Sequence, residues 1–213
     1  MLQTTQLAPE TAELLGDIRP LIEQLGSPDG MAAFAASAGT PPARQITTAR
    51  DLRMFLENYH AKILRPVELP AIQRAFNHAA RNELRELVAY DKQLSSEPLL
   101  QNFAAASRCV GHLQLQRLRP MRDQRLIKRY LAAVELGEAN GWHTLVYGLT
   151  LSVYSLPLRQ GLIGYAQQTT LGFIQSAARS LSLTDGEVRI FLDELSAAFP
   201  PAVETLLAQS VIG

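Results

Sequence analysis

The 213-residue sequence has little of what would assign it to a secreted, membrane-bound or nucleic-acid-binding class. It has one cysteine, Cys109, so no internal disulfide can form, and its first residues lack the basic-then-apolar order of a secretion signal. Both observations predict a cytoplasmic protein. Basic and acidic residues number 20 each, so no net charge attracts nucleic acid or an anionic membrane. We therefore expect neither as a partner.

Long apolar runs and alternating strand patterns are also absent. The stretch from Leu145 to Leu158 is interrupted by Gly148 and Pro157 and is too short to cross a bilayer. Apolar residues instead recur at helical spacing along nearly the whole chain, and 47% of the residues are hydrophobic. We predict an all-α, single-domain bundle over residues 1–213, with about eight to ten helices around a central long helix, Leu158 to Leu181.

Proline, glycine and capping residues indicate where the helices begin and end. Thr184-Asp185-Gly186-Glu187 matches the capping box, in which Thr and Glu each satisfy an unpaired backbone amide. Thr48, with Asp51 in the following turn, is a second predicted N-cap. The predicted helices are 11–25 with a kink at Pro20, 48–63 ending before Arg65-Pro66, 69–81, 83–94, 98–118, one from Asp123 to Asn140-Gly141, 142–154, 158–181, and one from Thr184 to Pro200-Pro201, after which a short helix or frayed end follows.

Motifs for metal binding are missing from the sequence. The four histidines have no second His or Cys at metal-ligand spacing; they are His60, His78, His112 and His143. Glu57 and His60 have the spacing of half a di-iron motif, but that site needs a second such pair and two more carboxylates. A solvent-facing His60 is therefore the favoured interpretation, and we predict no metal ligand.

Signatures of catalysis are missing as well. The sequence has no phosphate loop, dinucleotide fingerprint, nucleophile elbow or zinc-protease helix. Cys109 lies within a helical pattern, and free cysteines are among the most buried residue types, so we predict a core thiol. The favoured interpretation is a protein that is not an enzyme, has no catalytic residue and needs no cofactor.

Basic residues are densest around the predicted junction near residue 120. The stretch comprises Arg117, Arg119, Arg122, Arg125, Lys128 and Arg129. The favoured interpretation is a solvated helix junction. The functional alternative is a surface for an acidic partner, whereas the balanced total charge disfavours nucleic acid.

The order of features resembles the UreF family of urease accessory proteins along nearly the whole chain. The segment from Leu25 to Gly39 is similar to the family's Ser-Pro-x-Leu-Pro-Val-Gly-Ala-Phe-Ser-x-Ser-x-Gly-Leu-Glu motif, with Gly30-Met31-Ala32-Ala33 in place of Leu-Pro-Val-Gly. Further matches are Val67-Glu68-Leu69-Pro70, Asp91 within 89–94, Gly111 after Ala106-Ser107-Arg108, His143 and Gly148 within 140–148, and Arg179 after Ala177-Ala178.

The resemblance implies an all-α homodimer that joins UreD (also called UreH) and the GTPase UreG to assist nickel insertion into apo-urease. It implies partner contacts for Phe34, Ser37, Gly39 and Arg179, and structural roles for the motif residues Asp91, Gly111, His143 and Gly148. For Phe34 a place in the core, and for His143 a structural hydrogen bond, are the favoured interpretations. For Arg179 a favourable interaction with the helix dipole is an equal alternative.

Two hypotheses from other classes stay open at this point. One is a helical-bundle enzyme or cofactor-binding protein that uses Glu57 and His60, with Cys109 as a third group. The other is a helical regulator with a small-molecule pocket.

Overall fold

The computed structural model describes residues 16–37, 46–118 and 125–209. These residues form helices and, within those ranges, no β-strand, which confirms the all-α prediction. The α-helices are α2 (Arg19–Gly26), α3 (Pro28–Ser37), α4 (Ala49–Tyr59), α5 (Leu69–Ala80), α6 (Leu84–Leu94), α7 (Pro98–Gln101), α8 (Ala104–Leu118), α9 (Arg125–Glu135), α10 (His143–Val153), α11 (Leu158–Leu181), α12 (Asp185–Ser196) and α13 (Phe199–Gln209), with the π-helix η1 (His60–Glu68) between α4 and α5.

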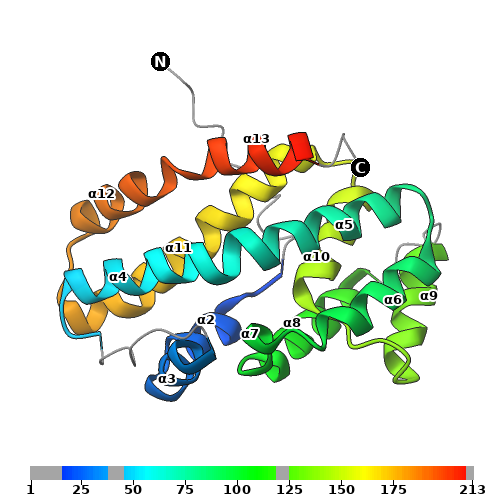
Figure 1. Ribbon diagram of the computed structural model, residues 1–213, viewed down its shortest axis with the longest axis horizontal. Coiled ribbons are helices and arrows are strands. Elements are labelled where there is room, and N and C mark those ends of the chain that lie inside the picture. The colour runs from blue at the N-terminus through cyan, green and yellow to red at the C-terminus, as the bar shows by residue number, and fades with distance from the viewer. Residues whose placement is uncertain (1–15, 38–45, 119–124, 210–213) are drawn as a thin grey trace.

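A single continuous rod is formed by α4, η1 and α5 (Figure 1). The predicted break at Arg65-Pro66 is therefore wrong, because the chain passes Pro66 inside the π-helix. Proline has no N–H, and its ring clashes with the backbone of a regular α-helical turn. A wider turn with i→i+5 spacing accommodates the residue without ending the helix.

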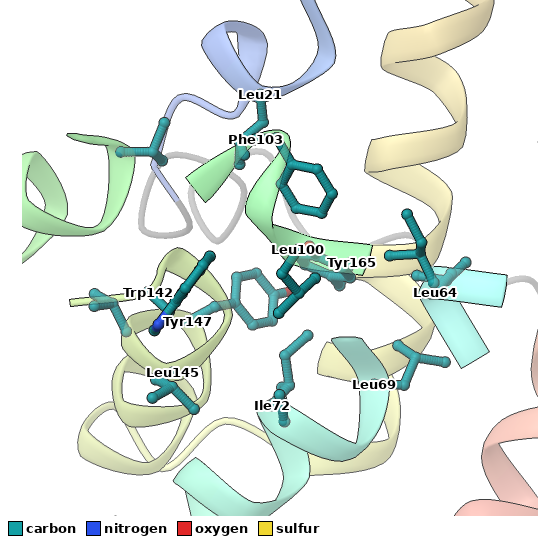
Figure 2. Close-up of a cluster of buried hydrophobic side chains, with 14 of the residues drawn as sticks. Leu21, Leu64, Leu69, Ile72, Leu100, Phe103, Trp142, Leu145, Tyr147 and Tyr165 are labelled. Carbon is teal, nitrogen blue, oxygen red and sulfur yellow. The ribbon is translucent and has the colours of Figure 1, made fainter. Parts of the chain in front are cut away.

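The long helix α11 begins and ends at the predicted residues and lies at the centre of the packing. It packs against α2, α4, α5, α10, α12 and α13. Figure 1 shows it passing behind the rod, with α12 and α13 on one side and α2 on the other. Helix α10 is more deeply buried, since every residue from His143 to Leu151 is buried, and it packs most extensively against α5. Side chains of α2, α5, α7, α10 and η1 surround Tyr165 of α11 (Figure 2).

Both predicted N-caps are confirmed as capping boxes. The Thr48 hydroxyl accepts the Asp51 amide at 3.1 Å, and the Asp51 carboxylate accepts the Thr48 amide at 3.0 Å. Thr184 and Glu187 repeat this exchange at the start of α12. Local side-chain chemistry thus fixes the start of these two helices.

Three prolines open helices rather than kinking or ending them. Residues 16–18 are not helical, and Pro20 lies in the first turn of α2, so the predicted helix 11–25 and its kink are wrong over the described residues. Pro200 and Pro201 lie in the first turn of α13 instead of ending the preceding helix. The first turn tolerates proline because its N–H groups have no helical partner.

Two other predicted helices end earlier than expected. The helix expected over 98–118 is divided into α7 and α8 at Asn102 and Phe103. Helix α9 ends at Glu135, and Gly137, with φ 73°, is the left-handed residue that follows it. Gly141 is also left-handed, with φ 71°, but it belongs to the loop before α10. The predicted cap Asp123 lies outside the described residues.

Candidate functional site

Asp91 fixes the loop that leads into the buried helix α10. Its carboxylate on α6 is fully buried and accepts the backbone amides of Asn140 at 2.6 Å and Gly141 at 2.9 Å. It also accepts the Asn140 side-chain amide at 2.9 Å and the Tyr130 hydroxyl at 2.5 Å. Four donors compensate for the loss of water around this carboxylate. Hydrogen bonds to this one side chain therefore connect α6, α9 and the loop.

Gly111 on α8 lies against the same loop. A Cβ atom at this position would lie 2.0 Å from the Gly141 carbonyl oxygen and 3.0 Å from the His143 amide nitrogen. Gly148 on α10 makes a similar approach to α5, where a Cβ would lie 2.3 Å from the carbonyl oxygen of Ile72. Both glycines are required because two backbones meet without room for a side chain.

His143 begins α10 and joins three helices through its ring. The Nδ1 atom lies 2.8 Å from Ser107 Oγ on α8, and Nε2 lies 2.6 Å from the Tyr165 hydroxyl on α11. Burial lowers the pKa of His143 to about 3, so the ring is neutral at physiological pH. A neutral ring with both nitrogens in hydrogen bonds has a structural role.

Glu68, at the end of η1, is a second fully buried carboxyl group. It accepts the Tyr59 hydroxyl at 2.6 Å, and Tyr165 supplies a further hydrogen bond. Burial raises its pKa to about 7, against the lowering effect of these two phenols. Tyr59, Glu68, Tyr165 and His143 thus form one polar chain through the apolar centre.

A small cavity lies beside this polar chain. Its volume of about 20 Å³ is enough for roughly one water molecule. Leu21, Ile22 and Leu25 of α2 line one side, and Glu68 and His143 are among the residues on the other. The space is too small for an organic substrate.

Sequence reasoning overlooked the buried position of Glu68, although a signal was present. Leu64, Glu68 and Ile72 follow one another at four-residue spacing, and all three are buried. A carboxylate within an apolar stripe indicates a buried, hydrogen-bonded acid. The break predicted at Arg65-Pro66 hides this signal, because it separates Leu64 from Glu68 and Ile72.

The predicted partner-binding residues have different environments. Phe34 is 3% exposed and packs edge-on against Phe55, with ring centroids 6.2 Å apart, so its side chain belongs to the core. Ser37 is the last residue of α3, and Gly39 lies outside the described residues. Arg179 is exposed in the last turn of α11. Among these residues, Arg179 has an environment suited to contact with another protein.

The residues of the enzyme hypothesis do not converge. His60 is not solvent-facing, because it is buried with Nε2 2.8 Å from Thr170 Oγ1, and burial lowers its pKa to about 4. Glu57 is exposed, so the two do not form one site. Cys109 is exposed, not a core thiol, because the α8 stripe that faces inward contains Ser107, Val110 and Gly111 instead.

Two further findings concern the described residues as a whole. No group of three or more His, Cys, Asp or Glu side chains among them is arranged to hold a metal ion. None of the helices described is both long enough and apolar enough to span a membrane.

Fold and site together define an all-helical scaffold, whose buried polar groups join helices to one another. Comparison with known proteins makes this more specific. The UreF family model matches residues 46–195, which is more than half of the chain, and the chain therefore belongs to the UreF family. It is 21% identical over 138 residues to the urease accessory protein UreF of Sporosarcina pasteurii, which covers 65% of this chain and 68% of that protein.

Proposed function

We propose that this chain is a urease accessory protein that acts through protein contacts. It would bind UreD/UreH and UreG homologues and assist nickel insertion into apo-urease, with nickel as cargo of the assembly. The observation that carries the proposal is the family match over residues 46–195, which runs from before the start of α4 nearly to the end of α12. The name of the Sporosarcina pasteurii relative supports the same role.

The geometry of the interior supports a role without covalent chemistry. Asp91 accepts four hydrogen bonds from groups that hold the α10 loop, and both ring nitrogens of His143 are engaged. These groups are committed to the scaffold and face no space that would admit a substrate. The surface is then the part of the molecule that acts on other proteins.

Helix α4 contacts both described elements that carry predicted contact residues, α3 and α11. Phe55 of α4 packs against Phe34 of α3 and against Phe173 of α11, with ring centroids 6.2 and 5.2 Å apart. Figure 1 shows the end of α11 near the start of α4, with α3 lower in the view beside α2. We propose that Ser37 of α3 and Arg179 of α11 contribute to one contact surface beside α4, whereas the predicted contact of Gly39 lies outside the described residues.

The assembly role includes three further proposals. The chain acts as one domain, forms a homodimer, and works in the cytoplasm beside the urease it matures. The family resemblance supports the dimer, and the single cysteine supports a reducing compartment.

Reconstitution tests this function directly. The full chain is combined with UreD/UreH and UreG homologues, apo-urease, nickel and GTP, and complex formation, urease-bound nickel and urea hydrolysis are measured. We expect a complex on size-exclusion chromatography and at least about ten-fold more active urease than without the chain.

An Arg179→Ala variant should reduce activation, with the exposed Lys62→Ala on η1 as the control. Activation unchanged in Arg179→Ala would remove this arginine from the contact surface. Absence of a complex in every nucleotide state would contradict the proposed function itself.

A further inference from the structure

The outer faces of α6 and α9 enclose an open groove that none of the interactions above uses. Its volume is about 500 Å³. The hydrogen bond from Tyr130 to Asp91 connects the inner faces of the same two helices. The groove lies on the outer side of this connection. The groove belongs to neither the polar centre nor the end that contains Arg179.

The floor of the groove is apolar and follows helical spacing on both sides. Leu84 and Val88 lie one turn apart on α6, and Ala132 and Leu136 lie one turn apart at the end of α9 and just beyond it. Leu136 is 74% exposed and lines the groove together with these residues, so the apolar side chains are grouped and not scattered. Two rows of apolar side chains with this spacing, one on each helix, can contact the apolar stripe of a third helix.

The rim of the groove carries an excess of positive charge. Arg85, Lys92 and Arg129 line it, whereas Glu138 is the acidic residue in the lining. None of these three cations takes part in the ion pairs found among the described residues. The rim therefore has positive charge that the described part of the chain does not neutralise, although the whole chain has none in excess.

The opposite flank of α6 extends this positive surface. A second groove between α5 and α6 is lined by Arg74 and Arg81, with Glu86 as its acid, and the His78 ring in the same lining is hydrogen-bonded to Glu83. Its lining is more polar than that of the α6–α9 groove and includes Asn77 and Gln93. A negatively charged partner on the first groove would thus meet the same sign of charge on both sides of α6.

We propose that the α6–α9 groove binds an acidic amphipathic helix of a partner protein. Apolar side chains at positions i, i+3 or i+4, and i+7 of the partner fill the floor, and carboxylates beside them meet Arg85, Lys92 and Arg129. The lining residues of α6 run from Leu84 to Lys92, which is roughly 12 Å of helix axis, so two to three turns of the partner are in contact. Nucleic acid is a poorer match for the floor, because leucine and valine side chains form no favourable polar interaction with phosphate groups.

A synthetic peptide tests the groove on the full-length chain. The probe is a fluorescein-labelled, side-chain-stapled helix of about 18 residues, long enough to span the groove, with leucines in one stripe and glutamates beside them. One control peptide replaces every glutamate with lysine, and a second scrambles the leucine positions. We expect saturable binding of the acidic probe by fluorescence anisotropy, weakened by added salt, and at least ten-fold weaker binding of both controls.

Groove variants show where the probe binds. Arg85→Glu with Arg129→Glu reverses the rim charge. Leu136→Asp places a charge on the floor, and the chain should still fold because Leu136 is largely exposed. Each should weaken binding at least ten-fold. Arg50→Glu with Lys62→Glu, two exposed cations on α4 and η1, is the matched control and should bind as the unmodified chain does.

Three outcomes would overturn the proposal. One is equal binding of the acidic probe to the unmodified chain and to the groove variants. Another is binding of a labelled oligonucleotide that the same rim variants abolish while the acidic peptide does not bind. The third is loss of self-association in Leu136→Asp by analytical ultracentrifugation with no peptide binding to the unmodified chain, which would make the occupant a second copy. Because the peptide assay needs no urease component, its failure is separate from failure of the proposed function.

Discussion

Asp91 and Glu68 are both buried carboxyl groups, but the protein surrounds them differently. Asp91 receives four hydrogen bonds, two of them from backbone amides of the loop just before α10. Glu68 receives bonds from two tyrosines and lies beside a cavity. The first region is held by groups that cannot move without unfolding the loop, and the second by side chains alone.

The difference shows what each carboxyl group contributes. A carboxylate with four donors forms a permanent junction, and removing it leaves several buried groups without partners. A carboxyl group with two phenol donors titrates near neutral pH, since burial raises the pKa of Glu68 to about 7. The α10 loop should therefore depend on the presence of the Asp91 side chain, and the stability of the end of η1 should depend on pH.

Replacing Asp91 tests the stronger of the two regions and should have the largest effect. Asp91→Ala leaves the Asn140 and Gly141 amides and the Tyr130 hydroxyl without their acceptor inside the protein. We expect the free energy of unfolding to fall by about 3–5 kcal/mol, because several buried donors lose their acceptor at a cost of about 1–3 kcal/mol each. Urea denaturation followed by circular dichroism measures this. Asp193→Ala, on the exposed side of α12, should change the stability by less than about 0.5 kcal/mol.

Replacing Glu68 tests the weaker region through its pH dependence. The folded state keeps the Glu68 proton up to a pKa of about 7, whereas the unfolded chain releases it near the ordinary value of 4.5. The folded state therefore binds more protons in this window, and its stability falls as pH rises from about 4.5 to 7. Glu68→Gln should gain about 3 kcal/mol relative to the unmodified protein across that window.

The two buried histidines change the stability with pH in the opposite direction to Glu68. The quantity to measure is therefore the difference in stability between Glu68→Gln and the unmodified protein at each pH. Burial lowers the pKa of His60 to about 4 and of His143 to about 3, so both make stability rise with pH up to about 6.5. Both are present in each protein, and their effect cancels on subtraction. Glu57→Gln, at an exposed site, is the control. A difference between Glu68→Gln and the unmodified protein that stays constant from pH 5 to 8 would show that Glu68 does not titrate there.

Replacing Gly111 tests whether backbone contact contributes to the rigidity around Asp91. In Gly111→Ala, the new methyl group meets the Gly141 carbonyl oxygen, which the Asp91 network holds in place. We expect a loss of about 1–3 kcal/mol, the usual cost of overpacking. Gly186→Ala is the matched control, because a Cβ there would have the Thr184 hydroxyl oxygen as its nearest neighbour at 4.0 Å. Equal stability of the two variants would mean that the α8–loop contact can relax.

The sequence was sufficient to predict local features of the fold. Helical spacing gave the all-α class and the bounds of α11, and the Thr48 and Thr184 capping boxes were visible as residue patterns. These features depend on residues within one or two turns of each other. The predicted effects of proline were less accurate. A proline in a first helical turn, such as Pro200, opens a helix, and a proline in a π-helix, such as Pro66, lies inside one.

The polar centre could not be predicted in the same way. Asp91 and His143 were recognised through a family motif, but their partners lie 22 to 50 residues away in sequence and meet only in the packed structure. His60 and Cys109 were assigned to the wrong environments for the same reason. A helical residue's burial depends on which neighbouring helix covers its face, and a single sequence does not specify that arrangement.

Each carboxyl group accepts a hydrogen bond from a tyrosine hydroxyl that can be removed by substitution with phenylalanine. These two substitutions should have the smallest effects, and they compare the two regions most directly. At pH 8, Tyr130→Phe leaves Asp91 with three donors, and Tyr59→Phe leaves Glu68 with the bond from Tyr165. We expect a loss of about 1–2 kcal/mol for each, since one buried hydrogen bond is removed. The cost of Tyr59→Phe should be smaller at pH 5 than at pH 8, because a hydrogen bond to neutral Glu68 is weaker than one to the charged form. Chemical denaturation at both pH values measures the loss of stability. If Tyr59→Phe costs the same at pH 5 and at pH 8, Glu68 keeps one protonation state. That result would contradict the assignment of Glu68 as the pH-sensitive carboxyl group.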